Sequence, residues 1–191
     1  MRAMDRESRT PDPTPQPTLD LGDGLALRPW RWDDAPAVLA ACQDPEIERW
    51  AGLPQPFGEE ATFAFLDGAM SLWSDGQGAS FAMVDAEPGR LLGAITRYGP
   101  DGHRSTLGCW VAAPARGRGV GTRAIRAICD WTFAATATER IESFLLVGNA
   151  PSERMLVKAG FTREGLLRAW DVGADGRPVD CTAWSRLRGD P

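Results

Sequence analysis

The chain has 191 residues, a formal net charge of -5 at pH 7 and a pI near 5.0. This length fits one domain with its own core, and the acidic balance argues against general nucleic-acid binding, which needs a basic footprint. No apolar run is long enough to span a bilayer, and the amino-terminal segment lacks the apolar stretch of a signal peptide. We therefore expect a cytoplasmic protein with neither a membrane nor a nucleic-acid partner.

The first 20 residues differ in composition from the remainder. Four prolines alternate with other residues between Pro11 and Pro17, among threonines and charged residues. Such a composition favours extended, solvated chain and cannot bury apolar surface. We assign residues 1–20 to a proline-rich disordered tail and residues 21–191 to one folded domain.

The first half of the domain is predicted to contain a strand, two helices and a three-stranded meander. Residues 44–58 form a proline-interrupted connection between the two helices. Short turns at 87–89 and 99–102 join the three later strands, so these strands are antiparallel. In chain order, the predicted elements are a strand at 25–29, a helix from Asp33, a helix at 59–73 and strands at 81–85, 91–97 and 105–111.

The second half combines two helices with three further strands. The strand at 141–147 is reached through a helix, so it can lie parallel to the preceding strand. The elements are a helix at 120–133, the strand at 141–147, a helix capped by Asn149 and closed by Gly160, and a hairpin of strands at 161–170 and 178–187. The fold class is therefore mixed α/β, and no internal repeat is present.

The cysteines and the histidine exclude two kinds of site. The chain has one histidine, His103, and four scattered cysteines without a Cys-x-x-Cys pair, namely Cys42, Cys109, Cys129 and Cys181. Neither a zinc site nor a cysteine–histidine catalytic pair is expected, and we assign no metal ligands. Cysteines within apolar patterns are typical of a reducing compartment.

A glycine-rich basic turn between a strand and a helix is the clearest candidate site. It has the sequence Arg116-Gly117-Arg118-Gly119-Val120-Gly121. Glycines let successive N–H groups face one point, and the following helix adds the positive end of its dipole, so the turn suits a phosphate. Its spacing matches neither the dinucleotide fingerprint nor the P-loop. A glycine-rich turn without a ligand is the alternative.

The turn resembles the Arg/Gln-x-x-Gly-x-Gly/Ala loop of GNAT-type acyltransferases, which holds the pyrophosphate of acyl-coenzyme A. Further phrases resemble the RimJ/RimL-like group of that family, in the same order: Leu27-Arg28-Pro29-Trp30, Leu107-Gly108-Cys109-Trp110-Val111, Asn149-Ala150-Pro151-Ser152, residues 158–165 and residues 180–187. The resemblance extends from about Leu25 to Leu187. It implies a central, twisted, mostly antiparallel sheet of about seven strands flanked by about four helices.

The resemblance also implies acetyl-CoA as cofactor, with coenzyme A as product. It places the thioester and the pantetheine arm against the backbone of Trp110 and Val111. Asn149 either bonds the pantetheine arm or only caps its helix. The implied pyrophosphate site comprises Arg116, Gly117, Arg118, Gly119, Val120, Gly121 and Thr122, in which Arg118 either adds charge or is merely solvated.

In this family the amine attacks the thioester directly, without a covalent enzyme intermediate. The resemblance makes Ser152 the proton donor to the leaving thiolate and a contact of the cofactor, although a serine at this position also bonds its own helix terminus. An alkylamine with a pKa near 10 needs a base. The candidates are Asp171, Glu164 and Asp180, with Asp171 preferred because its neighbour Trp170 offers an apolar wall; solvated surface carboxylates are the alternative.

Three positions depart from the group. Thr106 stands where an acidic residue is common, Trp184 stands where tyrosine is common, and Met155 lies on the helix where many relatives carry a tyrosine. The only tyrosine is Tyr98. Four of the eight tryptophans, which either line an acceptor pocket or pack in the core, lie in the first part of the chain: Trp30, Trp32, Trp50 and Trp73.

We therefore expect an acyl-CoA dependent N-acyltransferase that moves an acetyl group to a primary amine. The acceptor is a protein N-terminus, a drug amine or a small metabolite, and a homodimer is compatible with the sequence. A succinyl-CoA dependent transferase is one alternative. A non-catalytic acyl-CoA sensor or accessory domain is another, because the departures remove usual acid–base groups.

Overall fold

The computed structural model describes residues 14–99, 102–173 and 176–190, so the predicted turns at 99–102 and 173–176 lie partly outside the described residues. The strands of the first half are β1 (Leu19–Gly22), β2 (Leu25–Pro29), β3 (Gly78–Asp85), β4 (Leu91–Tyr98) and β5 (Arg104–Val111). Those of the second half are β6 (Arg140–Leu146), β7 (Thr162–Val172) and β8 (Pro178–Leu187). The helices are α1 (Ala35–Ala41), α2 (Pro45–Trp50), α3 (Glu59–Ser74), α4 (Val120–Ala135) and α5 (Ala150–Lys158).

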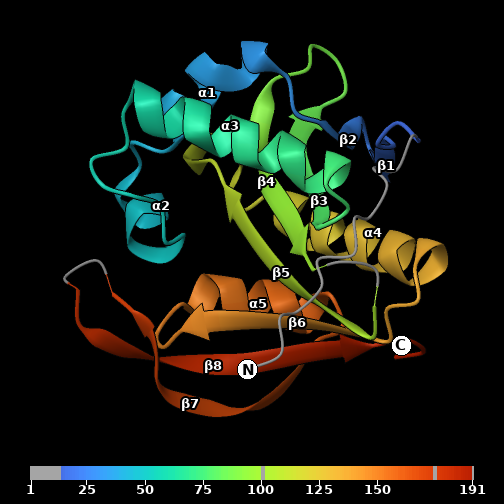
Figure 1. The fold of residues 1–191 in the computed structure, drawn as a ribbon, viewed down its shortest axis with the longest axis vertical. Coiled ribbons are helices and arrows are strands. Elements are labelled where there is room, and N and C mark those ends of the chain that lie inside the picture. Colours follow the sequence, from blue (N-terminus) through green and yellow to red (C-terminus); the bar gives the residue numbers. More distant parts are fainter. Residues whose placement is uncertain (1–13, 100–101, 174–175, 191) are drawn as a thin grey trace, which may run out of the picture.

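All eight strands form one sheet in the order β1-β2-β3-β4-β5-β6-β8-β7, which confirms the mixed α/β fold. Every pair is antiparallel except β5 and β6, which pair in parallel over only 104–106 and 140–142. In Figure 1 these two strands lie close together near the C-terminus of the chain and separate with increasing distance from it. The sheet therefore has two parts that are joined at one end only. We call β1–β5 the first limb and β6, β8 and β7 the second limb.

The core has two parts, one on each face of the first limb. Helix α4 packs on one face through Ala124, Ile125 and Ile128, together with apolar residues of β3, β4 and α5. Helices α1, α2 and α3 cover the other face and enclose a second cluster that includes Trp30 and Trp110. Successive residues of a strand point to opposite faces, so β5 contributes side chains to both clusters.

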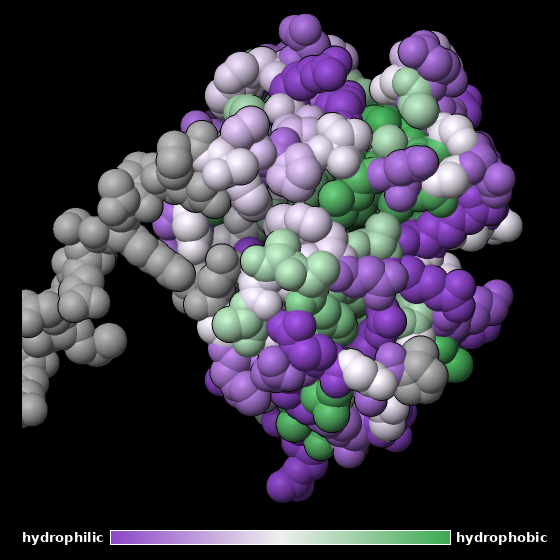
Figure 2. Space-filling view, turned by 90° about the vertical axis from the view of Figure 1, so that its right-hand side faces the viewer, coloured by the Kyte–Doolittle hydropathy of each residue, from purple (hydrophilic) through white to green (hydrophobic). Residues whose placement is uncertain are grey.

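The amphipathic sequence of α4 predicts which of its faces packs against the sheet. Its apolar positions recur at three- and four-residue spacing and are buried, whereas Arg126 and Asp130 are exposed. Figure 2 views the molecule from the side of α4 and the carboxyl end, where hydrophilic residues cover most of the surface and hydrophobic ones form small patches. Among the described residues, no helix combines the length and the apolar character that crossing a membrane requires.

The structure adds one helix and one strand to the predicted elements. Helix α2 lies within the expected connection at 44–58, where the Asp44 carboxylate accepts the N–H of Glu46 at 2.8 Å and Pro45 occupies the first turn. An aspartate followed by proline is a helix-start signal that identifies α2 in retrospect. Strand β1 is the second addition, and it pairs with β2 across a short turn.

The expected tail ends earlier than residue 20. Residues 1–13 lie outside the described part of the chain, but Thr14, Gln16 and Leu19 contact the domain. The Trp73 indole donates to the Thr14 carbonyl at 2.9 Å, and the Gln16 amide donates to the Ser80 carbonyl at 2.8 Å. Strand β1 begins at Leu19, so a boundary at residue 20 falls inside a strand.

Two truncated chains test this boundary. We expect a chain that starts at Thr14 to keep the parent Tm, whereas a chain that starts at Asp20 melts about 4 °C or more lower, because it loses two hydrogen bonds worth about 1 kcal/mol each. Thermal unfolding followed by circular dichroism measures both. An unchanged Tm for the chain from Asp20 would restore the original boundary, and a lowered Tm for the chain from Thr14 would show that residues 1–13 contribute to stability.

Candidate active site

A cleft of about 840 Å³ opens where β5 and β6 separate. Its lining includes residues 107–111 of β5 on one side and 143–146 of β6 on the other. The glycine-rich turn and the amino ends of α4 and α5 close one end, while α2 and residues 171–173 border another part. The division of the sheet therefore leaves strand edges available to a ligand.

The edge of β5 in the cleft is formed by alternate backbone groups. The Ser143 hydroxyl donates to the Leu107 carbonyl at 3.1 Å, and the Arg116 Nε donates to the Val111 carbonyl at 3.1 Å. Because backbone polar groups alternate along a strand, Cys109 and Val111 direct theirs toward the cleft, and Trp110 directs its own toward β4. The Trp110 backbone groups thus face away from the cleft edge, although Trp110 is among the lining residues.

The turn after β5 combines left-handed glycines with a helix start. Gly117 and Gly119 both have φ of +76°, and Gly119 is the residue that precedes α4. A Cβ at either position would meet no protein atom within 4 Å, so the turn is open to a ligand. The N–H groups of the first helical turn, in Val120, Gly121 and Thr122, have no helical acceptor and carry the positive end of the dipole.

Gly121 is explained by packing. A Cβ on Gly121 would lie 2.5 Å from the Met155 sulfur and 3.2 Å from the Val111 side chain. Helix α4 therefore approaches α5 and β5 as closely as it does only because this position has no side chain. The packing also holds the amino ends of the two helices beside the same cleft.

The two arginines of the turn have different surroundings. Arg116 lines the cleft and pairs with Asp44 at 3.1 Å, in addition to its bond with the Val111 carbonyl. Arg118 is not among the lining residues, and its guanidinium pairs with Asp85 at 3.3 Å. The Arg118 side chain is 43% exposed and makes this ion pair, and its two alternative roles stay predictions.

Asn149 and Ser152 lie at the start of α5. The Asn149 carboxamide oxygen accepts the backbone N–H of Ser152 at 3.2 Å, so the expected capping role is present. Asn149 is buried, and both residues line the cleft. The Ser152 hydroxyl is not used in this cap and has no hydrogen-bond partner within the described part of the chain.

Asp171 and Asp180 lie on the closing hairpin. Asp171 lines the cleft and is exposed, and its carboxylate accepts the N–H of Val172 at 2.8 Å. Asp180 does not line the cleft and accepts the N–H of Ala169 at 2.8 Å. Of these two predicted bases, Asp171 is the one that lines the cleft.

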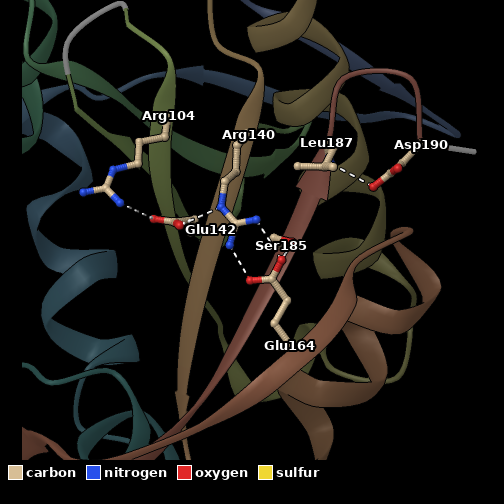
Figure 3. A network of polar contacts seen from close by, with 7 residues as sticks. All are labelled: Arg104, Arg140, Glu142, Glu164, Ser185, Leu187 and Asp190. Atoms are coloured by element: carbon tan, nitrogen blue, oxygen red, sulfur yellow. Dashed lines mark hydrogen bonds and ion pairs between the residues drawn. The ribbon is translucent and has the colours of Figure 1, made fainter.

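Glu164 is not in the cleft, which corrects its assignment as a catalytic candidate. Figure 3 shows its carboxylate held by Arg140, at 2.7 Å and through a second short bond, and by the Ser185 hydroxyl at 2.7 Å. The bonds from Arg140 first, and then from Ser185, lower the pKa of Glu164 to about 2. A carboxylate with this pKa is a poor base at neutral pH.

The network around Glu164 lies at the end of the cleft where β5 and β6 pair. Arg140 also donates to Glu142 at 2.7 Å, and Arg104 on β5 approaches Glu142 at 4.0 Å (Figure 3). These contacts join β5, β6, β7 and β8 beside the short segment where β5 and β6 pair. We infer that the network stabilises the junction between the two limbs.

The low pKa of Glu164 gives a pH-dependent contribution to stability. Because the folded-state pKa lies below the ordinary value of 4.5, the contribution is present above pH 4.5 and declines as the pH falls toward 2. Glu164→Gln should lower Tm by about 2–4 °C at pH 7, corresponding to about 1 kcal/mol at most for a partly exposed pair, and by less at pH 3. A Tm difference that grows on acidification would contradict this role.

Comparison with known proteins identifies the family. Residues 25–162 match the family model described as an acetyltransferase (GNAT) domain. The chain belongs to the GNAT acetyltransferase family. This acetyltransferase is 25% identical over 168 residues to the uncharacterized N-acetyltransferase YoaA of Bacillus subtilis, an alignment that covers 87% of the chain and 94% of that protein.

Solved structures share the fold. The ribosomal L7/L12 α-N-protein acetyltransferase RimL, in complex with coenzyme A, superposes with a TM-score of 0.82 at 17% identity, covering 92% of this chain and all of RimL, 100%. Mycobacterium smegmatis RimJ, in complex with CoA-disulfide, gives 0.75 at 26% identity over 85% of this chain and 81% of RimJ. The expected resemblance to the RimJ/RimL-like group is thereby confirmed.

The tryptophans that were considered for an acceptor pocket have diverse positions in this acetyltransferase. Only Trp50 lines the cleft. Trp30 is buried and bonds Ser80, Trp32 is half exposed, and Trp73 packs near Trp131. Sequence reasoning missed several other lining side chains that come from distant elements, namely Glu46, Glu48, Phe65, Tyr98 and Phe144.

Proposed function

We propose that this acetyltransferase binds acetyl-CoA in the cleft and transfers the acetyl group directly to a primary amine, either a protein N-terminus or a small molecule. The observation that carries the proposal is the continuity of the cleft from the open backbone edge of β5 to the amino end of α4. RimL, RimJ and the acetyltransferase MccE, which share the fold, have structures with coenzyme A, CoA-disulfide and acetyl-CoA respectively.

The residues present fit the cofactor. When bound, acetyl-CoA supplies an activated thioester carbon for the amine to attack. The open positions at Gly117 and Gly119 leave room for a pyrophosphate beside the N–H groups that begin α4. The backbone of Cys109 and Val111 offers hydrogen bonds to the pantetheine arm. An N–H from this edge would stabilise the developing oxyanion by about 3 kcal/mol.

In this proposal, one side chain acts as the general base and another as the general acid. Asp171, exposed at the edge of the cleft, accepts the proton of the amine, directly or through water. Ser152, whose hydroxyl is free of the α5 cap, gives a proton to the leaving thiolate. Arg116 adds positive charge beside the turn while keeping its bond to the Val111 carbonyl.

A non-catalytic acyl-CoA sensor is the second candidate. On β5, Thr106 stands where relatives often carry an acidic residue, and it lies opposite Glu142 in the strand register. On α5, Met155 stands where many relatives carry a tyrosine. These observations reduce the number of acid–base groups at the cleft without affecting the cofactor turn.

The release of free thiol separates the candidates. Acetyl-CoA or succinyl-CoA is mixed with the protein and with peptides bearing free N-termini, aminoglycosides or polyamines, and thermal shift reports binding in parallel. A ligand at 100 times its Kd stabilises the fold by about 2.7 kcal/mol. We expect both stabilisation and amine-dependent thiol release with acetyl-CoA. Stabilisation without thiol release for any amine would favour the sensor, and a preference for succinyl-CoA would replace the acetyl assignment.

A further inference from the structure

Helix α2 is tied to the cofactor turn through one carboxylate. The Asp44 Oδ1 accepts the backbone N–H of Glu46 at 2.8 Å and that of Ile47 at 3.4 Å, and therefore caps α2. The same oxygen pairs with the Arg116 guanidinium at 3.1 Å. Any displacement of Arg116 therefore acts on the first turn of α2.

Arg116 is fixed to the cofactor side of this connection. Its Nε donates to the Val111 carbonyl at 3.1 Å, at the end of β5, while its Nη2 pairs with Asp44. The side chain thus joins three elements: the last residue of β5, the glycine-rich turn and the start of α2. Asp44 is mostly buried, with 17% of its side chain exposed, so the pair is partly shielded from water.

The other end of α2 lies close to the turn that follows β6, in the second limb of the sheet. The Trp50 indole donates to Glu46 at 3.0 Å, and the Arg49 guanidinium lies 4.4 Å from the Trp50 ring centre. The edge of the Trp50 ring lies 4.0 Å from the position of a Cβ on Gly148, in the turn between β6 and α5. Figure 1 shows α2 at the end where β5 and β6 lie furthest apart.

We propose that Asp44 is a positioning residue that couples occupancy of the turn 116–122 to the cleft wall formed by α2. The inference rests on the proposed function, because it takes acyl-CoA as the ligand of the turn. A pyrophosphate on the turn restricts Arg116, and Asp44 passes that restriction to α2. The wall that carries Glu46 and Trp50 is then held more firmly when the turn is occupied.

Two aspartates allow a matched test. Asp44→Asn keeps an oxygen that caps α2 but removes the charge that holds Arg116. Asp85→Asn removes the charge that holds Arg118, the other arginine of the same turn, from the end of β3. Hydrogen exchange of the α2 amides is measured by mass spectrometry in the parent and in both variants, with and without saturating acetyl-CoA. Calorimetry gives the Kd of acetyl-CoA for each protein.

We expect acetyl-CoA to slow exchange in α2 at least threefold in the parent and in Asp85→Asn, and by less than half that factor in Asp44→Asn. The Kd for Asp44→Asn should stay within about fivefold of the parent value, because backbone groups hold the phosphates. Equal slowing in Asp44→Asn and the parent, or no slowing in a parent that binds acetyl-CoA, overturns the coupling. Absence of binding to the parent overturns the proposed function itself, and the coupling with it.

Discussion

Replacing Ser152 by alanine is expected to reduce kcat by about 100-fold or more while changing the Kd of acetyl-CoA by less than about threefold. A proton donor to the thiolate acts in the transition state, where general acids contribute about 10²–10⁴-fold. The substitution is structurally mild because the cap of α5 uses the backbone N–H of Ser152 and not its hydroxyl. The fold and the helix start should therefore survive.

Steady-state kinetics and calorimetry on Ser152→Ala make the test, with Asn149→Ala as the control for the cap. The control removes the oxygen that accepts the Ser152 N–H, so it should lower stability by about 1 kcal/mol. An unchanged kcat with a raised KM for acetyl-CoA would leave Ser152 as a cofactor contact. A parent protein without turnover would leave no rate to lose and would support the sensor.

Gly119→Val is expected to weaken acetyl-CoA binding by more than tenfold, equivalent to about 1.4 kcal/mol. The φ of +76° is unfavourable for valine by about 1–2 kcal/mol, so the turn would shift away from its present conformation. A side chain that kept this conformation would occupy the open space in front of α4. Either outcome displaces the N–H groups that are proposed to bind the pyrophosphate.

Gly24→Val controls for backbone strain. Gly24 has φ of +70°, and a Cβ added there would meet no protein atom within 4 Å, as at Gly119, but Gly24 lies in the turn between β1 and β2, away from the cleft. Calorimetric titration of both folded variants with acetyl-CoA should show a loss of affinity in Gly119→Val only. Parent-like affinity in Gly119→Val would remove the turn from the cofactor site.

Local features of the site could be predicted from the sequence. The turn 116–121 is contiguous, its glycines determine the backbone, and the following helix begins at once, so its form depends little on distant residues. The cap at Asn149 is equally local. Regular periodicity placed most strands and helices, whereas α2 was missed because the surrounding prolines and glycines concealed a helix of only six residues.

The remainder of the site depends on tertiary structure. Strand β7 has register shifts between Arg163 and Gly165 and between Leu167 and Asp171, so simple alternation does not show which face each carboxylate occupies. This is why Glu164 and Asp171 were both candidates in the sequence and occupy different surroundings in the structure. The choice of Val111 over Trp110 likewise depends on which edge of β5 faces the cleft.

A crystal structure of the protein with acetyl-CoA tests the central claim most directly. We predict electron density for the pyrophosphate against the backbone N–H groups of residues 117–122, and for the thioester between β5 and β6 beside Val111. Pyrophosphate density elsewhere on the surface, or an empty cleft at saturating acetyl-CoA, would contradict it.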